Sequence, residues 1–123
     1  YMVSYKRWHL IGLELPYSVA SVGIRGEATG AATEFRADVV AVAKRDLSAG
    51  ELLDGEGGYT VSGGLRPALL SVRNGYVPLG LAHQVKLIRS VVKDQAVSWD
   101  DIEIDPTTSA YRLRKEVEAG VAP

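Results

Sequence analysis

The chain has 123 residues, of which 46% are hydrophobic, so it can build one domain with a modest core but not two full domains. Its 14 basic and 15 acidic residues are spread along the sequence, which excludes the basic surface that binds nucleic acid or anionic lipid. The absence of cysteine excludes disulfides, thiolate metal sites and cysteine nucleophiles. We therefore expect a cytoplasmic protein with neither nucleic acid nor a membrane as a partner.

Residues 1–37 are expected to form a connector from an upstream domain, because the chain opens on Tyr1 in mid-phrase and resembles a segment of a longer protein. A short helix is predicted within 9–26, where the apolar spacing is partly helical and Pro16 suits a first turn. Charged and polar residues interrupt its apolar run, which is therefore neither a signal peptide nor a membrane span. The stretch 25–37, rich in glycine, alanine and threonine, is predicted to be irregular.

Residues 38–104 are predicted to form the compact domain. The β-branched run 39–43 predicts a buried strand that becomes polar at Lys44, and Gly50 predicts a tight turn before the chain returns to the core. The glycine-rich stretch 54–67 is predicted to be loop, with a short strand at 59–61.

Two further predictions follow along the same domain. Asn74-Gly75 between apolar runs predicts a hairpin turn with a strand on either side. After a strand near 85–88, Ser98 is predicted to cap a short turn, with Asp101 returning the hydrogen bond.

An imperfect internal repeat links residues 45–53 and 89–97, since each has a basic strand end, an apolar step, a polar turn and another apolar step. This repeat predicts two strand-turn-strand lobes related by an approximate two-fold axis. One departure is Asp94, which stands where the first copy has Gly50. The alternative is that any two passages from strand to turn look alike at this length.

The last part of the chain, 105–123, is predicted to be a helix and tail. Asp105-Pro106 can start this helix, Ala110, Leu113 and Val117 share one face, and Gly120 ends it. The predicted fold class is therefore mainly β, with long loops and one C-terminal helix.

The sequence predicts no catalytic residue, no cofactor-binding residue and no metal ligand. The glycines at 55, 57 and 58 match neither a P-loop nor a dinucleotide fingerprint, so turn flexibility explains them better. His9 and His83 lack partners at metal-ligand spacing, and the adjacent acids at 100 and 101 are explained by capping.

Four basic residues are candidates for binding a substrate or another anion: Lys44, Arg45, Arg66 and Arg89. The repeat places Arg45 and Arg89 at equivalent strand ends, and two arginines can grip a carboxylate or phosphate bidentately. The alternative is that these are ordinary solvated charges at strand ends.

The whole chain resembles a known family. The phrases 42–47, 50–53 and 87–102 resemble the SAF domain, a small β-clip module shared by type III antifreeze proteins, sialic acid synthases, flagellar P-ring chaperones and altronate dehydratases. The phrases 9–14, 54–61 and 78–82 are similar to the C-terminal region of homoserine-dehydrogenase-like NAD(P)-dependent oxidoreductases. Some members of that group resemble 1-deoxy-xylulose-5-phosphate reductoisomerase.

This resemblance implies a β-clip domain at 38–104 that is not catalytic alone and supports assembly or shapes the substrate cleft. It implies that NAD(P) binds to an upstream Rossmann domain of the same protein, which forms a homo-oligomer, and that no cofactor binds to this segment. Residues 9–30 would then pack on the upstream domain. The alternatives are a stand-alone SAF module that binds carbohydrate or ice, and a domain like the flagellar P-ring chaperone.

Overall fold

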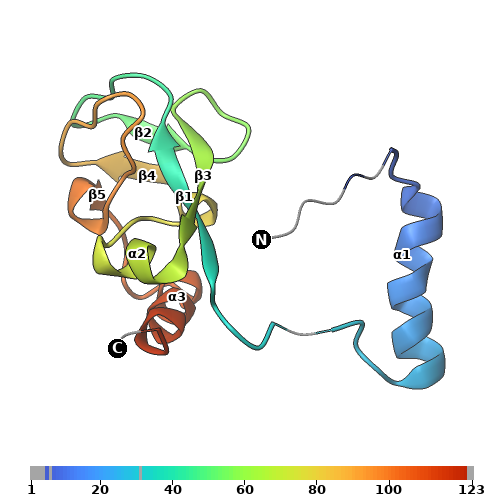
Figure 1. The fold of residues 1–123 in the computed structure, drawn as a ribbon. Helices are drawn as coiled ribbons and strands as arrows, with labels where there is room; N and C mark the ends of the chain where they lie inside the picture. The colour runs from blue at the N-terminus through green and yellow to red at the C-terminus, as the bar shows by residue number, and fades with distance from the viewer. Residues whose placement is uncertain (1–4, 6, 31, 122–123) are drawn as a thin grey trace. The chain divides into compact units, whose positions relative to one another are not determined.

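The structure, a computed structural model, describes residues 5, 7–30 and 32–121 and divides the chain into two units, 1–33 and 34–123 (Figure 1). The first unit contains helix α1, and the second contains five strands and two further α-helices among its described residues. Helical segments are as prominent as the short strands, so the expectation of a mainly β chain is met only roughly. None of the described helices has the length and apolar character needed to cross a membrane.

The described part of the N-terminal unit contains one helical segment, as predicted. Helix α1 (Ile11–Ala20) continues into a π-helical turn, η1 (Ser21–Arg25), and ends at Gly26 with a φ of 66°. Pro16 lies inside α1 and not in its first turn, so that part of the prediction is wrong. The helix starts earlier, and at its beginning the Glu14 carboxylate accepts the Leu10 N–H at 3.4 Å.

The strands of the C-terminal unit form two small sheets. Strand β1 (Ala37–Ala43) pairs antiparallel with β3 (Val61–Pro67). The second sheet has the order β2-β4-β5, formed by Leu52–Asp54, His83–Leu87 and Ile102–Glu103. The buried cluster draws on both sheets and on the two turns of the repeat; its members include Ala41, Ala43, Leu47, Leu53, Val61, Val77, Leu87, Val91 and Val97.

Strand β3 passes through Gly63-Gly64, where the sequence predicts a loop. A Cβ at Gly64 would lie 2.6 Å from Cγ2 of Val42, and one at Gly63 would lie 2.8 Å from Cγ1 of Val39. These glycines therefore let β3 lie close against the β-branched side chains of β1. The strand predicted at 59–61 begins only at Val61.

The predicted hairpin at Asn74-Gly75 is wrong, because residues 68–73 form a helix, α2 (Ala68–Arg73). The Gly75 N–H donates to the Val72 carbonyl at 3.1 Å, and the Tyr76 N–H donates to the Ser71 carbonyl at 3.0 Å. This is the Schellman pattern that ends helices, and it needs the positive φ (62°) of Gly75. A left-handed glycine suits either a hairpin turn or a helix end, which is why the sequence signal was ambiguous.

Two short 3₁₀ helices, η2 (Leu79–Leu81) and η3 (Trp99–Asp101), precede β4 and β5. The cap predicted at Ser98 is confirmed. The Asp101 carboxylate accepts hydrogen bonds from the N–H and the hydroxyl of Ser98, at 2.8 and 2.6 Å.

The two copies of the repeat hold each other through equivalent hydrogen bonds, as the repeat predicts. Leu47 and Val91 occupy the same place in the two copies and exchange a pair of backbone hydrogen bonds, at 2.8 and 2.9 Å. Gly50 and Asp94 are also equivalent, and both take a positive φ, of 93° and 67°. Asp94 therefore keeps the turn geometry that glycine supplies in the first copy.

Each turn is also held by a pair of backbone hydrogen bonds to the strand residue that precedes the other copy. The Gly50 N–H donates to the Leu87 carbonyl at 2.7 Å, and the Asp94 N–H donates to the Ala43 carbonyl at 2.8 Å. The return bonds match too: Leu87 N–H donates to Glu51 O at 2.8 Å, and Ala43 N–H donates to Gln95 O at 2.9 Å. We call these eight residues the clasp: Ala43, Leu47, Gly50, Glu51, Leu87, Val91, Asp94 and Gln95.

The C-terminal helix α3 (Ser109–Ala119) starts later than predicted. The Asp105 carboxylate accepts hydrogen bonds from the N–H and hydroxyl of Thr107, at 2.8 and 2.7 Å, and so forms a turn. Thr108 then caps the helix, and Gly120 ends it as predicted. The predicted apolar face of α3 is largely exposed, because the helix packs on the domain through other residues, described below.

The shared turn geometry yields a prediction. Gly50→Ala should destabilise the domain by about 1–2 kcal/mol, because an L-residue is strained at this φ. Asp94→Gly should stabilise it by less than about 1 kcal/mol, because the strain is relieved there. Both values are measured by urea unfolding.

The matched control is Gly80→Ala, since Gly80 has neither a positive φ nor an atom within 4 Å of an added Cβ. The equivalence of the two turns is contradicted if Gly50→Ala lowers the free energy of unfolding no more than Gly80→Ala does. It is also contradicted if Asp94→Gly lowers the free energy of unfolding.

Candidate functional site

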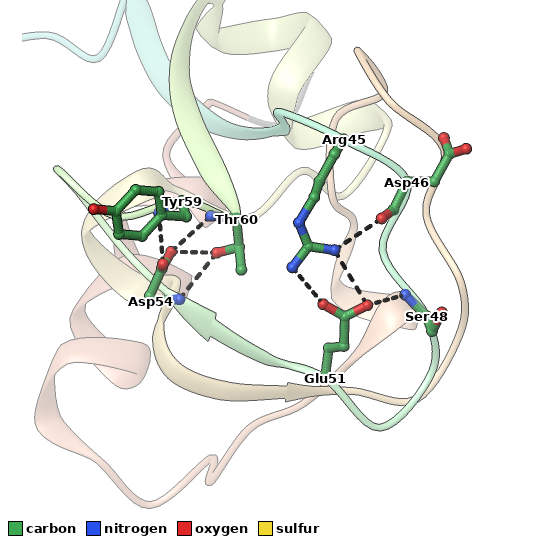
Figure 2. A network of polar contacts seen from close by, with 7 residues as sticks. All are labelled: Arg45, Asp46, Ser48, Glu51, Asp54, Tyr59 and Thr60. Atoms are coloured by element: carbon green, nitrogen blue, oxygen red, sulfur yellow. Dashed lines mark hydrogen bonds and ion pairs between the residues drawn. The ribbon is translucent and has the colours of Figure 1, made fainter.

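Arg45 is the first of the four basic candidates that we describe. It follows β1, and its side chain points toward Glu51 in the first turn of the repeat (Figure 2). Its guanidinium donates to both carboxylate oxygens of Glu51, at 2.7 and 3.4 Å, and to the Asp46 carbonyl at 3.0 Å. The same carboxylate accepts the Ser48 N–H at 2.7 Å. The hydrogen bond between the two side chains raises the pKa of Arg45 and lowers that of Glu51. Arg45 therefore already holds a carboxylate, which closes the first turn of the repeat.

Arg89 occupies the equivalent place in the second copy but has a different partner. The residue equivalent to Glu51 is Gln95, which carries no charge. Arg89 instead approaches Asp100 at 3.9 Å, and both side chains are largely exposed. Of the two arginines, Arg89 is thus the more weakly held and the more accessible to an anion.

The structure does not bring these two arginines to one place. Each lies two residues before Leu47 or Val91, and these two residues pair antiparallel. In an antiparallel pair such positions lie at opposite ends of the paired segment. In this register, Arg45 and Arg89 are too far apart along the paired segment to bind one anion together.

Lys44 and Arg66 also make separate contacts. The Lys44 ammonium donates to the Gly58 carbonyl and so ties the end of β1 to the glycine-rich loop. Arg66 lies in β3, opposite Asp38 in the register, and its guanidinium donates to the Leu65 carbonyl at 2.9 Å. The four basic residues are thus spread over the domain, and their role in anion binding stays a prediction.

The glycine-rich loop after β2 is closed by Asp54 (Figure 2). Its carboxylate accepts the N–H groups of Tyr59 and Thr60, at 2.5 and 3.0 Å, and the Thr60 hydroxyl. The hydrogen bond from the Thr60 side chain, followed by those from the two backbone N–H groups, lowers the pKa of Asp54 to about 2. An added Cβ at Gly58 would lie within 2.5 Å of the Asp54 carboxylate, so glycine is required where the loop crosses it. The glycines here serve the turn, as predicted.

Neither histidine joins a group of potential metal ligands. The His83 ring lies 3.0 Å from the Asp54 carbonyl, and the His9 ring lies 3.2 Å from Glu14. Among the described residues, no three His, Asp or Glu side chains lie close enough together to hold a metal ion.

A buried ion network that the sequence did not predict lies where α3 meets the domain. Asp38 of β1 is 6% exposed and accepts two hydrogen bonds from Arg114 of α3, at 2.6 and 3.1 Å. The Ser71 hydroxyl of α2 donates to the same carboxylate at 2.5 Å. Arg114 also donates to Glu118 at 2.7 Å, which in turn accepts a hydrogen bond from Lys115 at 2.8 Å. One carboxylate thus joins β1, α2 and α3.

Burial and pairing act in opposite directions on the charges of this network. Burial opposes the charge of Arg114, but its hydrogen bonds to Asp38 and Glu118 outweigh that effect and raise its pKa. Burial likewise acts against the Glu118 carboxylate, and the hydrogen bonds from Lys115 and Arg114 outweigh it and lower the pKa. Arg114 and Glu118 therefore remain ionised near neutral pH.

Aromatic rings complete this contact. The Arg114 guanidinium lies 4.9 Å from the centre of the Phe35 ring, and the Lys115 ammonium lies 4.2 Å from that of Trp99. Tyr111 meets Trp99 edge to face, with ring centres 5.4 Å apart. Charged and aromatic groups, and not an aliphatic stripe, attach α3 to the domain. In the sequence, the only indication of this network is Asp38, a single acidic residue at the start of an apolar strand.

A groove of about 330 Å³ lies between β4 and the chain that leads into α3. Leu81, Val85 and Ile104 give it an apolar lining, and His83, Gln84 and Glu103 are also on its wall. None of the four basic candidates lines it.

Comparison with known proteins leaves the family open. No protein-family model matches the chain, and no curated protein matches it. A function can therefore be proposed only from the residues and their arrangement.

The lowered pKa of Asp54 predicts a pH dependence. A carboxylate whose pKa falls from 3.8 to about 2 on folding stabilises the fold above pH 4, and this stabilisation is lost as the pH falls toward 2. Asp54→Asn should therefore lower the urea midpoint at pH 7, whereas the difference from the parent chain should shrink at pH 2.

Glu56→Gln is the control, because Glu56 is an exposed residue of the same loop. A difference between Asp54→Asn and the parent chain that is the same at pH 7 and pH 2 contradicts this role for the ionised carboxylate.

The buried network predicts a large effect at Arg114. Arg114→Met should destabilise the domain by about 3–5 kcal/mol, because it leaves the Asp38 carboxylate buried without its cation. Arg112→Met, on an exposed face of the same helix, should change stability by less than about 0.5 kcal/mol. The measurement is urea unfolding at low protein concentration. Equal effects of the two substitutions would rule out a structural role for the ion pair between Arg114 and Asp38.

Proposed function

We propose that the chain is a C-terminal SAF module of a homoserine-dehydrogenase-like NAD(P)-dependent oxidoreductase. In this role it is not catalytic alone, but packs on an upstream catalytic domain and supports the assembly or the substrate cleft. NAD(P) would bind to the upstream Rossmann domain and not to these residues. The protein would act in the cytoplasm as a homo-oligomer.

The clasp is the feature of the fold that supports a β-clip. Two copies of a strand-turn-strand phrase hold each other through matched hydrogen bonds, which is the arrangement expected of a duplicated unit. Asp94, the residue that departs from the SAF pattern, takes the same left-handed backbone as Gly50. The departure in sequence is therefore not a departure in backbone geometry.

The observation that supports docking most strongly is the surface of α1. Within its own unit the helix buries no residue, and its large apolar side chains are more than half exposed. At 100° per residue they form two stripes on opposite sides of the helix. One stripe contains Ile11, Leu15 and Val19, and the other contains Leu10, Leu13 and Tyr17.

A helix that is apolar on opposite sides is typical of a buried helix and not of a solvated one. Glu14 is the one charged residue of α1, and it is engaged by the residues at the start of the helix. A neighbouring apolar surface is therefore the environment that suits this helix, and a preceding domain of the same protein would provide it.

The ice-binding alternative receives less support. It requires a flat, exposed surface of threonine and valine, and the sequence offered only 59–61 for this. Thr60 is 6% exposed and Val61 is fully buried, so this segment presents no such surface. No particular observation favours a carbohydrate-binding or chaperone-like module.

The proposal predicts what the gene encodes before residue 1. We expect a strand-turn-helix with Gly-x-Gly-x-x-Gly, the dinucleotide-binding fingerprint. In that longer protein, hydrogen exchange should show the α1 amides protected, and Leu13→Asp should remove this protection because it places a charge in an apolar contact.

Ser18→Asp is the matched control, since Ser18 lies on the polar side of α1, between the two stripes. An upstream sequence without this fingerprint, or α1 amides that exchange freely in the longer protein, would refute the proposal.

A further inference from the structure

Helix α3 faces the domain with its polar residues and faces solvent with its apolar ones. Arg114 and Glu118 point inward, with side chains 10% and 12% exposed. Leu113 and Val117 are 60% and 46% exposed. Ala110 extends the exposed apolar stripe by one turn.

This orientation is fixed by specific contacts. The bidentate pair between Arg114 and Asp38, with the ring contacts of Lys115 and Tyr111 on Trp99, sets the rotation of α3 about its axis. Burying an ion pair has a desolvation cost, and exposing Leu113 and Val117 gives up apolar burial. A helix held in this way leaves its apolar stripe exposed, which is a feature of surfaces that bind a partner.

The charges beside the stripe indicate which partner fits. Arg112 and Glu116 lie one turn apart on the side of the stripe away from the inward residues. Neither side chain makes an ion pair in the part of the chain that the structure describes. If a second α3 lies antiparallel across a two-fold axis between the levels of residues 114 and 115, Leu113 lies within about 1.5 Å, along the helix axis, of the level of Val117 in the second copy. Arg112 then lies equally close to the level of Glu116 of that copy.

We propose that α3 is a self-association surface, through which two copies of this chain pair antiparallel along the stripe of Ala110, Leu113 and Val117. The surface is self-complementary, as an interface across a two-fold axis must be. The stripe is small beside the roughly 1,200–2,000 Å² of stable interfaces, so association through it is reversible and depends on concentration. The proposal goes beyond the function proposed above and does not depend on an upstream domain.

Charge reversal in the complete 123-residue chain tests this arrangement. In sedimentation equilibrium, Arg112→Glu and Glu116→Arg should each weaken dimerisation by at least about tenfold, because each places like charges opposite each other. The double variant Arg112→Glu/Glu116→Arg should restore association, since it exchanges the two charges. Lys93→Glu has the same change of charge at an exposed turn and should leave association unchanged.

Crosslinking tests the register. Because the chain has no cysteine, every disulfide that forms joins two introduced cysteines. A mixture of Leu113→Cys and Val117→Cys chains should form 113–117 disulfides faster than either variant alone forms symmetric ones, because residues 113 and 117 are about 6 Å apart along a helix.

Four results would overturn the proposal. The first three are a parent chain that stays monomeric at millimolar concentration, single charge reversals without effect, and symmetric crosslinks that form as fast as mixed ones. The fourth is association that is weakened by Leu13→Asp in α1 and not by the α3 variants. The α3 variants leave the upstream sequence and the exchange of α1 untouched, so failure here is distinct from failure of the proposed function.

Discussion

The reciprocal clasp between the two copies of the repeat is the constraint on which the C-terminal unit depends. Each turn is closed by backbone groups of the strand residue just before the other copy, Leu87 or Ala43, so neither copy has a complete set of hydrogen bonds alone. Leu47 and Val91, at the centre, are buried and pair with each other. Long-range pairing of this kind places side chains from distant parts of the sequence in one core, and the outer helices are attached to that frame.

The second constraint is the Asp38 carboxylate, which lies at the start of β1 and joins two helices to it. Through Ser71 and Arg114 it fixes α2 and α3 to the strand, as the position of α3 beside the start of β1 shows (Figure 1). A buried ion pair contributes more to specificity than to stability in many proteins. Here it determines which side of α3 meets the core, and therefore which side is left exposed.

The sequence predicted features that depend on local chemistry, such as the cap at Ser98, the helix in 9–26 and the repeat itself. It was wrong where one local signal serves two structures: Asn74-Gly75 ends a helix here because the preceding residues pack as a helical turn. It also missed the pair of Asp38 and Arg114, since no local rule connects residues 76 positions apart. For Lys44, Arg45 and Arg89 the sequence located the strand ends, but it placed Arg66 after a loop and not within β3. It also did not reveal that the Glu51 carboxylate is already paired with Arg45.

Native-state hydrogen exchange of the clasp amides tests this account most directly. The Ala43 and Asp94 N–H groups close one half of the clasp, and the Gly50 and Leu87 N–H groups close the other. If the clasp is mutual, both halves should open with the same free energy, equal to that of global unfolding by urea. Exchange of one half at a clearly lower free energy than the other would show that the copies fold independently and would contradict the account.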